Sequence, residues 1–209
     1  QLAGGGGADV LVGGSGSDTL EGVSCNDTLY GDADPADPQN ETLRWDLEGT
    51  KGSDLTGGFT QTTGAMDVTV AITNDGALTS AEVDTVNDQH FVSGEPFSEN
   101  SALELAGSGG SDTATVTLTF ASTDDGDSED AVQNVSFRLN DVDTGGWTDT
   151  FTITAVDGNG DPVTVTLSAT DTTNVTNGGT VTAGVGNGGS DTPAGSVLVE
   201  IAGPVARID

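Results

Sequence analysis

A glycine-rich unit of nine residues recurs at the amino terminus, at residues 4–12, 13–21 and 22–30. In each unit the sixth residue is aspartate, and leucine follows two residues later. The aspartates are Asp9, Asp18 and Asp27, and the leucines are Leu11, Leu20 and Leu29. Glycine-rich sequence by itself is typical of a flexible linker. Because glycine, aspartate and leucine recur together at one spacing, the segment is better interpreted as a structural repeat.

The residue types of the unit predict a metal-binding turn followed by a short strand. Glycine adopts positive φ without steric cost, so it permits a tight turn. The carbonyl groups of such a turn and the aspartate carboxylate are hard oxygen ligands, which suit Ca2+. The residues predicted to form this Ca2+ site are Asp9, Asp18, Asp27, Gly4, Gly13 and Gly22.

Charge and composition restrict the possible partners. The 209 residues include 34 acidic and 4 basic side chains, and the formal net charge is −30. So acidic a chain repels nucleic acid and anionic membrane surfaces, and divalent cations relieve the repulsion between its carboxylates. No apolar run is long enough to insert into a membrane, and no signal peptide is visible. Cys25 is the only cysteine, which excludes an intrachain disulfide.

The rest of the chain has the pattern of an antiparallel β-sandwich. In residues 113–120, apolar residues alternate with threonines, and no segment keeps a helical period. Many short strands with one apolar face predict two packed sheets. We predict strands at 42–47, 58–62, 67–73, 82–86, 89–92, 102–105, 113–120, 132–139, 149–156, 163–167, 179–183 and 196–201. The predicted organisation is therefore all-β, with repeats at 1–33, a linker at 34–41 and a β-sandwich domain at 42–209.

Two further acidic clusters flank the predicted strand at 132–139. Asp125, Asp127 and Glu129 precede the strand, and Asp141 and Asp143 follow it. Each cluster is either a second kind of Ca2+ site, completed by a neighbouring loop, or a solvated acidic rim. The sequence favours neither interpretation.

A third acidic segment, residues 157–161, matches the first five positions of an EF-hand calcium loop. It then departs from that pattern, because Pro162 replaces the required glycine and Ser168 replaces the bidentate glutamate. A β-hairpin turn explains the segment better, since Asn159 and Gly160 favour positive φ. For His90, the sole histidine, we expect a structural role, because one histidine cannot build a zinc site.

The nonapeptide pattern G-G-x-G-x-D-x-U-x resembles the repeats-in-toxin (RTX, haemolysin-type) family of secreted calcium-binding proteins. In that family two nonapeptides form one turn of a parallel β-roll, with Ca2+ between turns. The resemblance implies that Asp9 and Asp27 lie on one side and Asp18 on the other. Residues 134–143 and 147–157 resemble sandwich domains of large RTX proteins from marine bacteria. We therefore expect the chain to be a fragment of a large exported bacterial protein.

The sequence is consistent with two functions. The first is a non-enzymatic, extracellular or cell-surface structural or adhesive protein, which binds calcium and assembles with neighbouring copies in a fibre or surface layer. The alternative is a calcium-dependent carbohydrate-binding module, with Trp147 as the platform for glycans unless it is a buried core tryptophan. An enzyme is disfavoured, because residues 42–209 contain no recognisable catalytic set.

Overall fold

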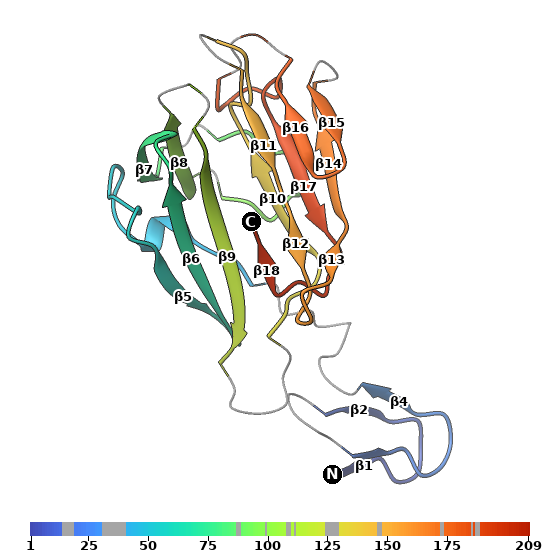
Figure 1. Cartoon of the computed structure of the whole chain (residues 1–209). Helices are drawn as coiled ribbons and strands as arrows, with labels where there is room; N and C mark the ends of the chain where they lie inside the picture. Colours follow the sequence, from blue (N-terminus) through green and yellow to red (C-terminus); the bar gives the residue numbers. More distant parts are fainter. Residues whose placement is uncertain are drawn as a thin grey trace.

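The structure is a computed structural model of the chain. Apart from one short 3₁₀ turn, η1 (Trp45–Leu47), the regular structure of the described residues is entirely β (Figure 1), which confirms the predicted all-β class. No helix among them has the length and apolar character needed to cross a bilayer. The described residues are 1–13, 19–30, 41–86, 89–98, 100–107, 110, 112–123, 130–145, 148–171, 174–184, 186 and 189–209, with Tyr30 described in its backbone only.

The amino-terminal repeats form two short parallel ladders. β1 (Leu2–Ala3) pairs with β3 (Leu20–Glu21), and β2 (Val10–Val12) pairs with β4 (Thr28–Tyr30). Each strand therefore pairs with the strand two units further along the chain, which is the connectivity of a parallel β-roll. Leu11 of β2 is buried between the ladders, with 5% of its surface exposed.

A six-stranded antiparallel sheet forms one layer of the larger β structure (Figure 1). Its longest strands, β6 and β9, pair over nine residues, and their inward side chains include Val68, Val70 and Phe120. Their outward side chains are mainly threonine, so the period of two in the sequence is what separates the two faces. In order, the strands are β13 (Pro162–Val163), β12 (Ala155–Val156), β18 (Arg207–Ile208), β9 (Ala114–Ser122), β6 (Met66–Asn74) and β5 (Phe59–Thr63).

The facing layer consists of two three-stranded antiparallel sheets, and β7 (Leu78–Asp84) pairs separately with β8 (Ala102–Gly107). Val199 and Ile201 of the facing layer share one core cluster with Val68, Phe120 and Ile208 of the six-stranded sheet. The core thus lies between packed antiparallel sheets, as a β-sandwich requires. The strands of the facing layer, in sheet order, are β10 (Val135–Leu139), β17 (Val197–Ile201) and β14 (Val165–Ala169), then β11 (Thr150–Thr152), β16 (Thr180–Thr182) and β15 (Val175–Asn177).

Two predicted strands are wrong, because other groups satisfy their backbones. In residues 42–47 the Arg44 N–H donates to Gln61 Oε1 at 2.8 Å, and Gln61 Nε2 donates to the Arg44 carbonyl at 2.8 Å. One side chain thus replaces a strand partner, and η1 follows. Residues 89–92 belong to a long connection between β7 and β8, where the His90 N–H donates to the Ser190 carbonyl at 2.8 Å.

A nearly buried ion pair ties that connection to the facing layer. Arg138 of β10 donates through Nε and Nη2 to the Glu95 carboxylate, at 2.7 and 2.6 Å, and through Nη1 to Ser196 Oγ at 2.8 Å. Only 7% of the Arg138 side chain and 19% of the Glu95 side chain are exposed. Glu95 also accepts the Val92 N–H at 2.8 Å, so its carboxylate fixes the local chain as well as the cation.

Candidate metal centre

The structure brings Asp9 and Asp27 together on one side of the repeats. The Asp9 N–H donates to Asp27 Oδ1 at 3.0 Å, and the Thr28 N–H donates to the Asp9 carbonyl at 2.8 Å. The loops that precede the two aspartates are stacked, because Ser24 N and Oγ donate to the Gly5 carbonyl at 3.2 and 3.1 Å. Sequence reasoning missed Ser24, which occupies a variable position of the repeat, so no pattern pointed to it.

The first glycine of each described loop leaves room for the carboxylate of the same loop. A Cβ added to Gly22 would lie 2.5 Å from Asp27 Oδ2, and one added to Gly4 would lie 2.9 Å from Asp9 Oδ2. Real Cβ atoms essentially never approach other atoms more closely than 3.0 Å. A side chain at either position would therefore force the aspartate carboxylate or the loop to shift.

The stacked loops hold negative charge without a cationic partner. Asp9 Oδ2 is buried and accepts no hydrogen bond from the described residues, which costs free energy unless another group satisfies it. The sequence places no lysine or arginine before Arg44. Carboxylate oxygens beside loop carbonyls are a donor set that Ca2+ prefers. The residues present therefore fit a Ca2+ ion held by the loops of Asp9 and Asp27.

Backbone groups are needed in such a site. Within the described ranges, no group of three or more aspartate, glutamate, histidine or cysteine side chains is arranged to hold a metal ion. A Ca2+ ion commonly takes six to eight oxygen ligands. Two aspartates alone are too few, so most ligands at this centre would be carbonyl oxygens of the glycine-rich loops.

Comparison with known families identifies this part of the chain. Residues 3–34 match the family model described as the RTX calcium-binding nonapeptide repeat (four copies). The amino-terminal segment is an RTX repeat array. Comparison with curated proteins and with solved structures gave no significant match. The family match is therefore confined to the RTX array.

The third unit of the RTX array keeps the turn although two of its glycine positions hold other residues. Val23 and Cys25 have φ of 74° and 80°, at the positions that Gly5 and Gly7 occupy in the first unit with φ of 92° and 130°. A residue other than glycine in this region costs about 1–3 kcal/mol. The penalty is steepest for a β-branched side chain such as that of Val23.

Replacing Val23 with glycine should strengthen Ca2+ binding by the RTX array. Relief of the strain exceeds the entropic cost of glycine, which is about 0.5–1 kcal/mol. If binding and folding are coupled, a net gain of about 1 kcal/mol raises the apparent affinity about fivefold. A Ca2+ titration followed by circular dichroism measures the apparent affinity. Ser24→Gly is the comparison and should give no gain, since Ser24 is not at positive φ and its Oγ hydrogen bond to the Gly5 carbonyl is lost; an equal gain there would contradict the strain argument.

Several predicted ligands lie outside the described residues, namely Asp18, Asp125, Asp127 and Glu129, and so does Trp147. Their roles, including glycan binding at Trp147, stay predictions. Gly13 is described and follows β2 directly.

Asp141 and Asp143 lie beside Asp149 in the loop between β10 and β11. The Asp143 N–H donates to Asp149 Oδ2 at 3.2 Å, and the Asp149 N–H donates to the Asp143 carbonyl at 3.2 Å. Burial, followed by the negative charges of Asp143 and Asp149, raises the pKa of Asp141. A cation would relieve this repulsion. The three acids do not form a cage, however, so a Ca2+ site at Asp141 and Asp143 also stays a prediction.

Residues 157–161 form the turn between β12 and β13, as the hairpin interpretation predicts. Asp157 Oδ1 accepts the N–H groups of Asn159 at 2.8 Å and Asp161 at 2.9 Å, and Gly160 has φ of 85°. The backbone hydrogen bond from Asp161 is the main cause that lowers the pKa of Asp157. The Asp157 carboxylate thus stabilises the turn.

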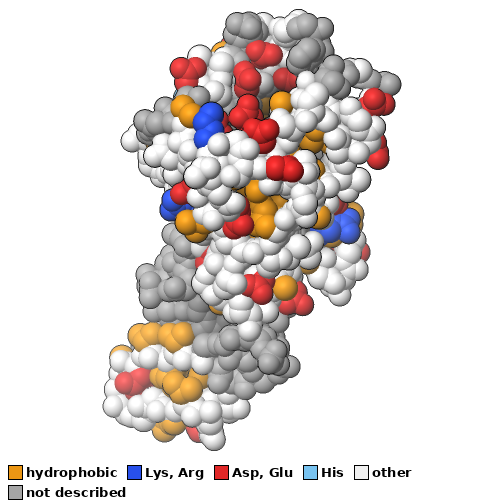
Figure 2. Space-filling model, turned by 90° about the vertical axis from the view of Figure 1, so that its left-hand side faces the viewer, with side chains coloured by type: hydrophobic (Ala, Val, Ile, Leu, Met, Phe, Trp, Pro, Cys, Tyr) orange, Lys and Arg blue, Asp and Glu red, His pale blue; other side chains and the backbone are white. Residues whose placement is uncertain are grey.

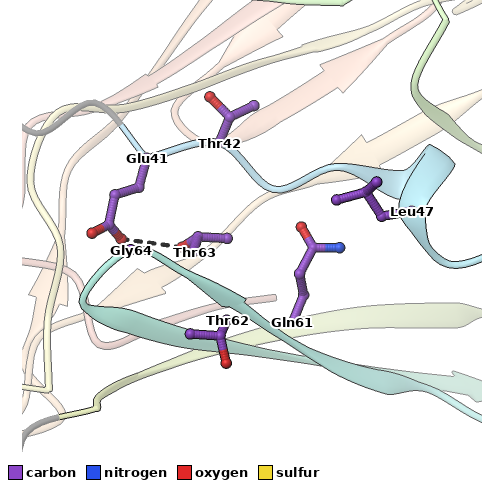
Figure 3. Close-up of a pocket in the computed structure, with 7 residues that line it drawn as sticks. All are labelled: Glu41, Thr42, Leu47, Gln61, Thr62, Thr63 and Gly64. Atoms are coloured by element: carbon purple, nitrogen blue, oxygen red, sulfur yellow. Dashed lines mark hydrogen bonds between the residues drawn. The ribbon is translucent and has the colours of Figure 1, made fainter.

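Two open hollows on the surface gather almost no titratable groups. The hollow of about 320 Å³ in Figure 3 contains one acid, Glu41, whose carboxylate accepts the Ala65 N–H at 2.7 Å and Thr63 Oγ1 at 3.1 Å. The other hollow, of about 380 Å³, lies over β5 and β6, and its lining residues, 56–60 and 69–72, include none. In the first hollow the Glu41 carboxylate is thus engaged by one backbone N–H and one hydroxyl, and the lining of the second hollow offers no acid or base.

Proposed function

We propose that this chain is a non-enzymatic calcium-binding structural or adhesive module, in which Ca2+ orders the RTX array. The observation that carries the proposal is the buried Asp9 Oδ2, which accepts no hydrogen bond from the described residues and lies in a loop stacked on that of Asp27. The RTX array has little core of its own, because Leu2 and Leu29 keep 39% and 43% of their surfaces exposed. Ion binding would therefore supply much of its folding free energy.

The same coupling supports an extracellular or cell-surface location. Proteins with RTX repeats are typically secreted, and Ca2+ is scarce inside cells and abundant outside them. An array that depends on Ca2+ stays unfolded during export and orders afterwards.

Neighbouring copies of the chain are the partners we propose for this role, in a fibre or surface layer. The RTX array presents apolar side chains to solvent, which are orange in the lower part of Figure 2. Val10 and Val23 of this array are 64% and 65% exposed. The end units of a repeat array leave a core that neighbouring segments can cover. Ca2+ would reduce the repulsion between chains of net charge −30.

A Ca2+ titration tests this function with two separate readouts. Circular dichroism should show β structure gained as Ca2+ rises, and light scattering should show an increase in particle mass. Trp45, which packs edge-on against Phe59 at 5.7 Å, should report by fluorescence that the sandwich is folded throughout. Unchanged dichroism between chelator and millimolar Ca2+ would refute calcium-dependent ordering. A gain of structure at constant mass would refute assembly with other copies.

A further inference from the structure

The two edges of the six-stranded sheet differ in how they are protected from pairing with further strands. β13, at one edge, is two residues long and begins with Pro162, whose backbone nitrogen carries no hydrogen. Short strands and proline are devices that prevent edge-to-edge association. β5, at the other edge (Figure 1), is five residues long, and its sequence Phe-Thr-Gln-Thr-Thr contains neither proline nor a charged residue. β5 is therefore the unprotected edge of this sheet.

The alternation of hydrogen bonds shows which residues of β5 direct their backbone groups outward. In an antiparallel ladder, alternate residues point both backbone groups to the same neighbour. The Phe120 N–H donates at 3.0 Å to the carbonyl of the residue before β18, so its partner in β6, Val68, points away from β9 and towards β5. Val68 pairs with Gln61, so Thr60 and Thr62 point to the open side. No strand of the described residues pairs with β5 there.

The chain around this edge is uncharged, although the protein is strongly acidic. Residues 55–66 contain no charged side chain, in a sequence with 34 acidic residues and a net charge of −30. The hollow over β5 and β6 is likewise lined without acids or bases. Two acids lie near the end of β5: Glu41, which accepts Thr63 Oγ1, and Asp67, which accepts Thr62 Oγ1. Two such chains repel each other, so they approach at least cost where both are uncharged.

The edge of β5 is complementary to itself. Thr60 and Thr62 lie symmetrically about Gln61, so an antiparallel second copy of β5 places its Thr62 opposite Thr60 and its Thr60 opposite Thr62. Residues paired in this way exchange both of their backbone hydrogen bonds. The threonine side chains then meet as favourable cross-strand pairs. Thr60 and Thr69 already form such a pair within the sheet, with their Oγ1 atoms 2.9 Å apart.

The positions of the acids favour the antiparallel orientation. In antiparallel pairing, Glu41 and Asp67, near the end of one β5, face Gly57 and Gly58 before the start of the other. Parallel pairing would instead bring the acids of both copies together. Leu47, which is 68% exposed, lines the hollow beside the end of β5 (Figure 3). A second copy would cover this apolar surface as well as pair the backbone.

We propose that β5 is an interface between two copies of this chain, which pair antiparallel about a twofold axis through Gln61 and join their six-stranded sheets. In such a contact the same surface serves both copies. The inference rests on the proposed function only in taking a second copy as the partner, because the interface lies in the sandwich and needs no Ca2+. Five paired residues form a small interface, so the dissociation constant should be on the order of 100 μM in high salt.

Sedimentation equilibrium and amide hydrogen exchange of the full chain test the interface. In chelator and 1 M NaCl, where the Debye length is about 3 Å, the mean mass should rise from 20.7 kDa towards twice this value between about 10 μM and 1 mM protein. Over this range, exchange at Thr60 and Thr62 should slow about fivefold, whereas amides of β15, an edge strand of a different sheet, should not change. A constant mass, or unchanged exchange at Thr60 and Thr62, would overturn the proposal.

Salt and protein concentration identify the occupant of the edge. Pairing of two uncharged edges should strengthen as NaCl rises from 0.1 to 1 M, because salt screens the repulsion between the copies. Weaker pairing at 1 M NaCl would show that ion pairs hold the interface, which contradicts the argument from charge. Protection of Thr60 and Thr62 that is independent of protein concentration would show that another segment of the same chain occupies the edge. That result would overturn the assignment to a second copy.

Thr60→Pro tests the backbone contact. It removes an N–H that points away from β6, where an edge strand tolerates proline. The affinity of the dimer should fall at least about tenfold, while the melting temperature of the dilute protein stays close to that of the unchanged chain. Thr60→Ala is the matched control, because it keeps the N–H, and its affinity should stay within about threefold. Equal affinities of the two variants would contradict the assigned contact.

A comparison with and without Ca2+ separates this interface from the proposed function. Assembly that occurs only in Ca2+ and is unaffected by Thr60→Pro would overturn the β5 interface and leave calcium-dependent assembly standing. A dimer that forms in chelator, is lost in Thr60→Pro and gains no further mass in Ca2+ would support the β5 interface. The same result would refute calcium-dependent assembly, so the two failures are distinguishable.

Discussion

Replacing Glu95 with alanine should lower the free energy of unfolding of the β-sandwich by about 3–5 kcal/mol. The reason is the charge left behind: Arg138 is 7% exposed, and Glu95 accepts two of its hydrogen bonds. Removing the Glu95 carboxylate leaves the Arg138 guanidinium without its counter-ion. Neither solvent nor another acid can neutralise the guanidinium as well as Glu95 does. Equilibrium unfolding in urea, followed by tryptophan fluorescence, measures the loss.

Two controls distinguish a buried pair from an ordinary ion pair. Asp46→Ala breaks the Arg44–Asp46 pair, whose side chains are 43% and 20% exposed, and should cost less than about 1 kcal/mol. The double variant Glu95→Leu with Arg138→Met removes both charges and should recover most of the loss, because apolar replacements of buried pairs are often neutral. Equal costs for Glu95→Ala and Asp46→Ala would contradict the argument.

The same pair sets an acid limit on stability. The hydrogen bonds from Arg138 are the main cause that lowers the pKa of Glu95 below its usual value. A carboxyl group with a lowered pKa in the folded state stabilises fully above its unfolded pKa, which is about 4.3. That contribution is lost as the pH falls from there through the folded pKa. As the pH falls from 5 through the folded pKa of Glu95, the free energy of unfolding should therefore decrease less in Glu95→Ala than in the unchanged chain.

The predictable part of the fold is the part decided by local alternation. β6 and β9 followed from the sequence, because burial of one face forces a period of two on their side chains. Residues 42–47 and 89–92 have strand-like composition, but Gln61 and Ser190 satisfy their backbones from distant positions. No local pattern encodes such partners, and the same holds for Glu95 and Arg138, which are 43 residues apart.

The candidate site likewise has a part that the sequence predicts and a part that it does not. The RTX resemblance implied that Asp9 and Asp27 share a side, and the structure places them in contact. The positive φ of Val23 and Cys25 could not be predicted, because neither residue favours it. The stacked loop imposes that backbone on them. The burial of Asp9 Oδ2 without a hydrogen bond from the described residues likewise emerges only when two distant units are placed against each other.

Replacing Gly22 with alanine should weaken Ca2+ binding by the RTX array about 10–100-fold, the range found when groups that orient metal ligands are changed. The added Cβ would lie 2.5 Å from Asp27 Oδ2, so the carboxylate or the loop must move. Asp27 also accepts the Asp9 N–H, so the displacement would reach the second aspartate. A Ca2+ titration followed by circular dichroism gives the affinity.

Gly6→Ala is the matched control in the same array. A Cβ there would meet only Ser24 Oγ, at 3.4 Å, and Gly6 has no positive φ. The affinity should therefore stay within about twofold of the unchanged chain, since no ligand is displaced. Asp27→Asn adds a second test, because an amide oxygen can still accept the Asp9 N–H while the negative charge is lost. If Asp27→Asn binds Ca2+ like the unchanged chain while Gly22→Ala does not, the loop is a structural turn and Asp27 is not a ligand. If Gly6→Ala and Gly22→Ala weaken Ca2+ binding equally, the effect comes from the loss of glycine flexibility. The space beside the carboxylate is then irrelevant.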